Sequence, residues 1–177
     1  MTAAPTVAHG IGPAQALDPS LLTELPALVR AVASFGLVLA FGAAVLVRYR
    51  KIVDTAVSVS MERPGFSLLY GHIAYALVVV VGTIGALQLN QLGVLNGMVL
   101  LGAAAVVATG VLLLAGLGYA VVGTWLTGIY GRRNPWNGLV FSAGLGALGW
   151  ALLPPILGAL VWVAIGALGI GGPVREW

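Results

Sequence analysis

The chain has 177 residues, of which 60% are hydrophobic and only 7% are charged, and its net charge is +3. A soluble domain carries roughly a quarter charged residues, and one this poor in charge would expose large apolar patches and aggregate. The composition therefore predicts a membrane protein, and the length allows one compact bundle without a sizeable second domain. The chain has no cysteine, which excludes disulfides, thiolate chemistry and cysteine-based metal sites.

Residues 1–20 are expected to form a flexible polar segment, because they contain several prolines and glycines and no Lys or Arg. This segment does not resemble a signal peptide, since no positively charged region precedes an apolar core. The remaining residues, 21–177, are predicted to form an all-α bundle of four to five transmembrane helices. About 20 consecutive apolar residues suffice for one crossing, and several such runs are present.

The first predicted span covers about 27–47, with Arg30 near its start, where a long side chain can reach the headgroups. It ends at a basic run that begins with Arg48. Residues 51–62 then alternate apolar and polar positions with a helical period but low overall hydrophobicity. We predict an amphipathic helix along the membrane surface, or a cytoplasmic extension of the first span, which ends before Pro64.

The second predicted span covers about 66–87, and a polar, uncharged turn follows it. The third, about 96–128, belongs to an apolar run that exceeds the hydrocarbon core of roughly 30 Å, so it must tilt, protrude or begin with a re-entrant piece. Pro154 and Pro155 divide the last region into spans of about 136–153 and 156–172, because proline cannot continue a helix. These short runs predict either two crossings or a re-entrant hairpin.

The basic residues predict the orientation of the bundle. Seven of the eight fall on one side of the membrane, six in the loops between spans and Arg175 after the last span, and the turns around Asn90 and Pro154 hold no charge. The positive-inside rule places the basic side in the cytoplasm. The chain is thus predicted to be a multi-pass cell-membrane protein, with its N-terminus outside and its C-terminus inside if it has five spans. Tryptophans near the expected span ends fit interfacial belts.

Small residues at four-residue spacing indicate where helices pack closely, because lipid supplies little hydrophobic drive for helix association. They form one stripe on the first span and one on the fourth: Gly36, Ala40 and Ala44, then Gly138, Ser142 and Gly146. Each stripe fits either ordinary packing within the chain or a face for homo-oligomerisation. We favour packing within the chain, because glycine is common in membrane helices.

No residue pattern predicts catalysis, a cofactor or a metal. His72 has no acidic or histidine partner in the spans, and a metal site needs several ligands, so an interfacial, hydrogen-bonded histidine is expected. Asp54 and Glu62 fit a solvated ion-pair face better than an acid–base pair. The spans lack the interior ionisable groups that ion-coupled transporters use, and their hydroxyls at Thr83, Thr109 and Ser142 can bond to their own helices.

The loops carry a cluster of basic side chains that is suited to anionic headgroups or to a cytoplasmic partner, at about 1 kcal/mol per charge for lipid. The candidate lipid-facing or partner-facing residues are Arg48, Arg50, Lys51, Arg63, Arg132 and Arg133. Nucleic acid is not expected as a partner, because the cluster is short and adjoins the bilayer.

The order and spacing of several short motifs resemble the polytopic membrane domain of archaeal and bacterial proteins associated with bactofilin-type, polymer-forming cytoskeletal domains. The resemblance covers roughly 125 residues, and the motifs that carry it are Glu62-Arg63-Pro64-Gly65 with Ser67-Leu68-Leu69, Gly123-Thr124-Trp125-Leu126-Thr127-Gly128, Asn134-Pro135-Trp136, Leu153-Pro154-Pro155-Ile156-Leu157-Gly158, and Gly166-Ala167-Leu168-Gly169-Ile170-Gly171. The chain departs from that pattern in lacking the β-helical polymer domain and in its turn at 88–97, where the family more often has Gly-x-Pro.

The resemblance implies a membrane anchor for a cytoskeletal or cell-surface polymer, and it brings no catalytic residues. Taken with the composition, it leads us to expect a non-enzymatic membrane scaffold with a cytoskeletal polymer or another membrane protein as partner. The alternative is a small channel or carrier for a neutral solute, lined by glycine-rich helices. A membrane-embedded enzyme is the least favoured class.

Overall fold

The computed structural model describes residues 25–93, 97–131 and 133–175, which form helices joined by short connections and contain no strand. The helices are α2 (Ala27–Glu62), α3 (Pro64–Gln91), α4 (Gly97–Ile129), α5 (Pro135–Leu152) and α6 (Pro155–Arg175). This confirms the all-α prediction. Four of them, α2, α3, α4 and α6, are long and apolar enough to cross a membrane, as expected for a multi-pass membrane protein.

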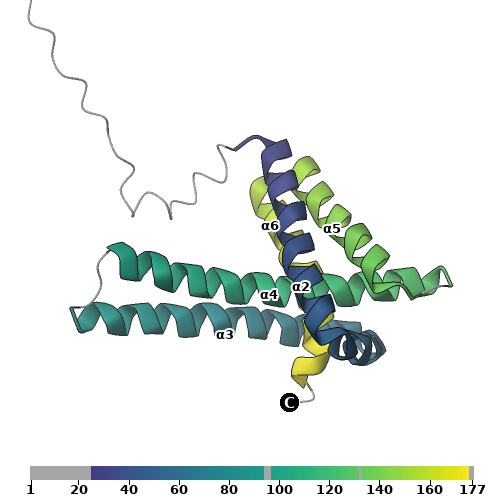
Figure 1. The fold of residues 1–177 in the computed structure, drawn as a ribbon, viewed down its shortest axis with the longest axis horizontal. Helices are drawn as coiled ribbons and strands as arrows, with labels where there is room; N and C mark the ends of the chain where they lie inside the picture. The colour runs from purple at the N-terminus through teal and green to yellow at the C-terminus, as the bar shows by residue number, and fades with distance from the viewer. Residues whose placement is uncertain (1–24, 94–96, 132, 176–177) are drawn as a thin grey trace, which may run out of the picture.

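The helices form two groups that cross at a steep angle (Figure 1). Helices α3 and α4 lie side by side as a long pair, while α2, α5 and α6 run together across one half of that pair. The two groups meet where α6 packs against α3 and where the second half of α4 packs against α2, α5 and α6. The other halves of α3 and α4 project beyond the crossing and are largely exposed, with apolar side chains such as Val80 and Val106 on their surface.

The crossing is closely packed because glycines let the helix backbones approach one another. A methyl group added at Gly71 of α3 would meet the backbone of Ala167 on α6, and one added at Gly118 of α4 would meet that of Gly166. Tyr119 is fully buried in the core beside these contacts. Close approach of small residues is the expected route to helix association in lipid, where the hydrophobic effect between helices is weak.

Helix α2 contains the first predicted span and the predicted amphipathic helix, joined by a bend at Tyr49, where φ is −131° and ψ is 33°. Beyond the bend, Val53, Ala56 and Val57 are buried in the core formed with α4. Ser60 donates a hydrogen bond to the carbonyl oxygen of Gly169 on α6 at 3.0 Å. The apolar face of this segment therefore packs against protein, an arrangement that the sequence pattern did not distinguish from contact with the membrane surface.

Helix α4 runs without interruption from Gly97 for 33 residues, a rise of about 50 Å. It exceeds the roughly 30 Å hydrocarbon core, so a crossing by α4 requires tilt or protrusion. The break that a re-entrant piece would need was expected near 96–97, and residues 94–96 lie outside the described residues.

Prolines begin both of the last two helices, at Pro135 and Pro155, since proline suits the first helical turn, where the missing N–H has no partner to lose. Leu153 closes α5, and its N–H donates to the carbonyl oxygen of Gly149 at 3.1 Å. Leu28 at the start of α2 and Ala151 at the end of α5 line the same surface groove. The turn between α5 and α6 therefore lies at the level of the start of α2. Helices α5 and α6 therefore lie along the first half of α2 (Figure 1).

Candidate functional site: a basic surface at one end of α2

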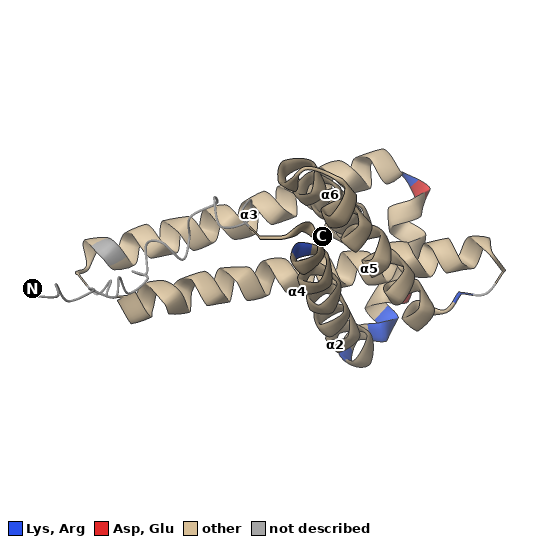
Figure 2. Cartoon of the chain, turned by 90° about the horizontal axis from the view of Figure 1, so that it is seen from above, with Lys and Arg blue, Asp and Glu red and all other residues tan. Residues whose placement is uncertain are grey.

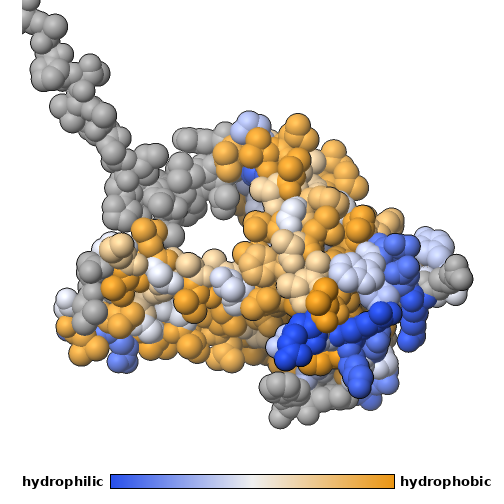
Figure 3. Space-filling view, in the orientation of Figure 1, coloured by the Kyte–Doolittle hydropathy of each residue, from blue (hydrophilic) through white to orange (hydrophobic). Residues whose placement is uncertain are grey.

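Charge is concentrated in a few places along the described chain. No Asp, Glu, Lys or Arg occurs in 64–131 or 134–174, so α3, α4 and α5 are uncharged in Figure 2. The exposed basic side chains lie around the bend of α2 and in the two connections that follow α2 and α4. We call this set the basic surface; it comprises Arg48, Arg50, Lys51, Arg63 and Arg133. It forms part of the hydrophilic region in Figure 3.

The bend in α2 positions three of these side chains. Beyond Tyr49 the helix turns its apolar face onto α4 and α6, which leaves Arg50 and Lys51 on the exposed side. The Arg48 guanidinium lies 5.5 Å from the ring centroid of Tyr49, within the range of a cation–π contact. Two acidic residues of the same segment, Asp54 and Glu62, are also exposed, so the described surface keeps an excess of positive charge.

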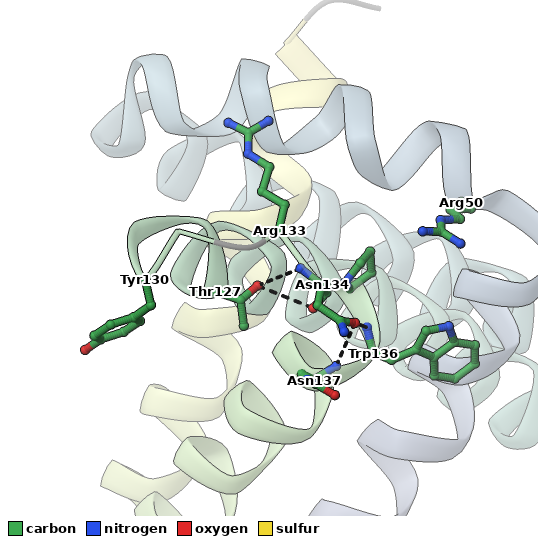
Figure 4. A pocket seen from close by; sticks show the side chains of 8 residues that line it. Arg50, Thr127, Tyr130, Arg133, Asn134, Trp136 and Asn137 are labelled. Carbon is green, nitrogen blue, oxygen red and sulfur yellow. Dashed lines mark hydrogen bonds between the residues drawn. The ribbon is translucent and has the colours of Figure 1, made fainter.

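A surface pocket of about 610 Å³ lies between the bend and the connection from α4 to α5 (Figure 4). Its lining combines two guanidinium groups with aromatic, amide and hydroxyl side chains: Arg50, Thr127, Tyr130, Arg133, Asn134, Pro135, Trp136 and Asn137. Figure 4 shows Arg50 approaching from α2, while Arg133 and Tyr130 project outward from the connection. This connection is thus the second element that builds the basic surface.

Asn134 holds the connection in place at the start of α5. Its Oδ1 accepts hydrogen bonds from the backbone N–H groups of Trp136 at 3.1 Å and Asn137 at 3.3 Å, which is the usual role of an N-cap residue. The Asn134 N–H donates to the hydroxyl oxygen of Thr127 at 3.3 Å. These bonds join the end of α4 to the start of α5 and fix where Arg133 leaves the backbone.

The chemistry of this pocket suits an anionic group. Guanidinium groups only donate hydrogen bonds and bind phosphate or carboxylate oxygens well. Trp136 is 46% exposed and Tyr130 is 85% exposed, and such rings favour the headgroup level of a bilayer. The pocket therefore combines features of a membrane–water interface with groups that bind acidic headgroups.

The structure places the predicted basic residues as follows. Arg48, Arg50, Lys51 and Arg63 are exposed around the bend and at the end of α2, and Arg133 is exposed beside α5. Arg132 lies outside the described residues. The sequence did not predict that Arg50 and Arg133 line one pocket, or that Thr127 and Asn137 belong to it. The only sequence signal for this pocket was the Asn134-Pro135 helix start, because it fixes the geometry of the connection that carries Arg133.

The two small-residue stripes have different surroundings. Gly138, Ser142 and Gly146 are buried, and Ser142 donates a hydrogen bond to the carbonyl oxygen of Tyr119 at 2.8 Å. Gly36, Ala40 and Ala44 are exposed, so this stripe is not the buried face of α2. Helix α2 packs instead through a neighbouring face that contains Ser34, Val38, Gly42 and Val45.

The other polar candidates offer no reactive constellation. His72 is exposed, and its Nδ1 lies 2.8 Å from the carbonyl oxygen of Leu68, to which it can only donate. Thr83 donates to the carbonyl oxygen of Val79 at 2.8 Å, as expected for a hydroxyl that bonds to its own helix. Within the described residues, no three His, Asp or Glu side chains come together as metal ligands.

No protein-family model, curated protein or solved structure matches the chain. Its composition and structure are those of an all-α, multi-pass membrane protein with a basic surface at one end.

Proposed function

We propose that the chain is a non-enzymatic membrane scaffold that engages anionic lipid headgroups and a cytoplasmic partner through its basic surface. The observation that carries the proposal is the gathering of Arg48, Arg50, Lys51, Arg63 and Arg133 at one end of an otherwise nearly uncharged bundle. The partner class is a polymer-forming cytoskeletal protein of the bactofilin type, as the motif resemblance implies.

The proposal places the basic surface in the cytoplasm and α2 across the membrane. Arg30 and Arg48 are 18 residues apart in α2, a rise of about 27 Å, which is close to the roughly 30 Å of a hydrocarbon core. Both guanidinium groups then reach headgroups on opposite sides. Because α6 is long and apolar enough to cross and α5 lies beside it along the same part of α2, the proposal takes the pair as two crossings, although α5 is not one of the four apolar helices.

The exposed side chains of the basic surface support a docking role over a catalytic one. Arg50 and Arg133 offer charge and hydrogen-bond donors in an open pocket, but no carboxylate or histidine that could serve as a general base lies among the residues that line it. Each basic side chain contributes about 1 kcal/mol toward an anionic surface. Several basic side chains together can hold an acidic partner or a patch of acidic lipid, and this binding requires no chemical step.

A flotation assay tests this function. The chain is reconstituted into phosphatidylcholine vesicles, and bactofilin-type filaments from the same cells are added. Filaments are expected to float with vesicles that contain the wild-type chain. They are expected to stay at the bottom of the gradient with the variant R48Q/R50Q/K51Q/R63Q/R133Q. The variant R30Q is the control, since Arg30 lies at the other end of the α2 span.

Two results count against the scaffold. The first is that filaments fail to float with the wild-type chain, which removes this partner class. The second is that the neutralised variant carries filaments as well as the wild type, which removes the basic surface from the interaction. Rapid glycerol flux in the same vesicles, abolished by Ser142→Leu, would instead support the neutral-solute carrier.

A further inference from the structure

The polar pocket at the start of α5, which Arg50 and Arg133 line, is followed along that helix by an apolar groove. The groove has a volume of about 610 Å³, and every residue that lines it is apolar. Its walls come from the first part of α2, with Phe35, and from α5, with Val140 and Phe141. Helices α2 and α5 therefore line a charged hollow and, beside it, an uncharged one.

The two hollows lie on the same face of α5. Trp136 and Asn137 line the polar pocket, while Val140 and Phe141, four residues further along, line the groove. Residues four apart in a helix are neighbours on one face. A molecule that occupies the polar pocket can therefore extend into the groove along the surface of the chain.

The polar pocket has free hydrogen-bond donors for an anion. No Asp or Glu is among the residues that line it. Arg50 and Arg133 are exposed, and neither makes a hydrogen bond or ion pair with another described residue. Figure 4 shows their guanidinium groups apart from each other, Arg50 on the side of Trp136 and Arg133 on the side of the connection. Each can bind phosphate oxygens through two N–H groups.

The groove has about the depth of one membrane leaflet. Val140 and Ala151 are 11 residues apart on α5, a rise of about 16 Å, and one leaflet contributes roughly half of the 30 Å hydrocarbon core. Gly144 leaves room in the middle, because nothing lies within 4 Å of a Cβ atom built there. The groove therefore suits an acyl chain that runs down from the headgroup level.

We propose that the polar pocket and the apolar groove together bind one anionic phospholipid. Arg50 and Arg133 hold its phosphate and headgroup, and an acyl chain lies in the groove against Phe35 and Phe141. A free phosphate would leave the groove uncovered, and a choline headgroup would place a cation beside two guanidinium groups, which repel it. The inference rests on the proposed function and deepens it, because it assigns one defined lipid site within the basic surface.

Native mass spectrometry of the detergent-solubilised chain tests the proposal, with phosphatidylglycerol and phosphatidylcholine as probes. One phosphatidylglycerol is expected to stay bound in preference to phosphatidylcholine. The variant R50Q/R133Q should reduce that preference roughly 25-fold, at about fivefold for each basic charge. The variant R48Q/K51Q is the matched control, because it removes the same charge from residues that do not line the polar pocket, and it should keep most of the preference.

Two glycines test the groove separately from the charges. Gly144→Leu places a side chain in the groove and should abolish the retained lipid, although both arginines remain. Gly102→Leu is the control, since a Cβ atom there also has nothing within 4 Å but lies outside the groove. If Gly144→Leu fails to fold, the comparison of R50Q/R133Q with R48Q/K51Q still decides the matter.

Four outcomes overturn the proposal. They are equal retention of the two lipids by the wild type, equal losses in the two charge variants, equal retention by the two leucine variants, and displacement of the lipid by inorganic phosphate at the same concentration. The filament flotation assay uses vesicles of phosphatidylcholine alone, so it tests the scaffold without an anionic lipid. Filaments that float while the solubilised chain retains no phosphatidylglycerol would overturn the lipid site and leave the scaffold standing.

Discussion

The close approach of α4 and α6 predicts a large cost for a single methyl group at Gly118. A Cβ atom at this position would meet the backbone carbonyl group and Cα of Gly166. Backbone atoms cannot rotate away as a side chain can, so the two helices must separate. Overpacking of this kind costs about 1–3 kcal/mol, and we expect Gly118→Ala to lower the free energy of unfolding by that amount.

Gly102 is the matched control on the same helix, since nothing lies within 4 Å of a Cβ built there. In an exposed helical position alanine is favoured over glycine by about 0.5–1 kcal/mol, so Gly102→Ala should be neutral or stabilising. The propensity gain is common to both positions, so the two variants should differ by the overpacking cost of about 1–3 kcal/mol. The measurement is reversible unfolding in mixed micelles with increasing dodecyl sulfate, followed by circular dichroism. Equal stability of the two variants would refute the close packing of α4 on α6.

Two further substitutions test the anchoring of the basic surface. Ser60→Ala removes the hydrogen bond to the Gly169 carbonyl oxygen, and it deprives the Gly172 N–H of the Ser60 Oγ acceptor that lies 3.2 Å away. We expect this variant to lose about 1–3 kcal/mol of unfolding free energy in the same assay. Ser58→Ala, on the exposed side of the helix, should change the stability little, and equal losses in the two variants would argue against the Ser60 contact. Asn134→Ala removes the N-cap of α5 and should cost about 1 kcal/mol. Asn137→Ala keeps the backbone N–H that the cap accepts from, so a drop as large as that of Asn134→Ala would contradict the assigned role.

Helix boundaries were predictable where proline or charge interrupts an apolar run. Pro135 and Pro155 begin helices in the structure, because a missing N–H costs nothing in the first turn. The extension of α2 past Tyr49 was one of two predicted alternatives, but the burial of its apolar face against protein was not predicted. Its charged run indicates the end of a span, whereas the burial of Val57 against α4 depends on residues far away in the sequence.

The faces through which helices pack were only partly predictable. Ser142 and its stripe on α5 are buried, but on the first part of α2 the buried small residues include Ser34 and Gly42 and do not include the nearby Ala40. Both faces of such a helix are apolar, because lipid suits the same side chains as the protein core. Periodicity therefore carries little information about which face meets protein. The pocket between Arg50 and Arg133 is also a tertiary feature, which their separation in the sequence conceals.

The central claim is that the chain crosses a membrane with its basic surface on the cytoplasmic side, and the accessibility of introduced cysteines tests it most directly. The natural chain has no cysteine, so each variant carries one thiol. The exposed positions Ser58 and Tyr130 lie near the basic surface, while Leu92 and Leu152 lie at the far ends of α3 and α5. In intact cells, a membrane-impermeant maleimide should label the Leu92→Cys and Leu152→Cys variants but reach those at Ser58 and Tyr130 only after lysis. Labelling of all four from outside, or of none but Ser58→Cys and Tyr130→Cys, would contradict the account.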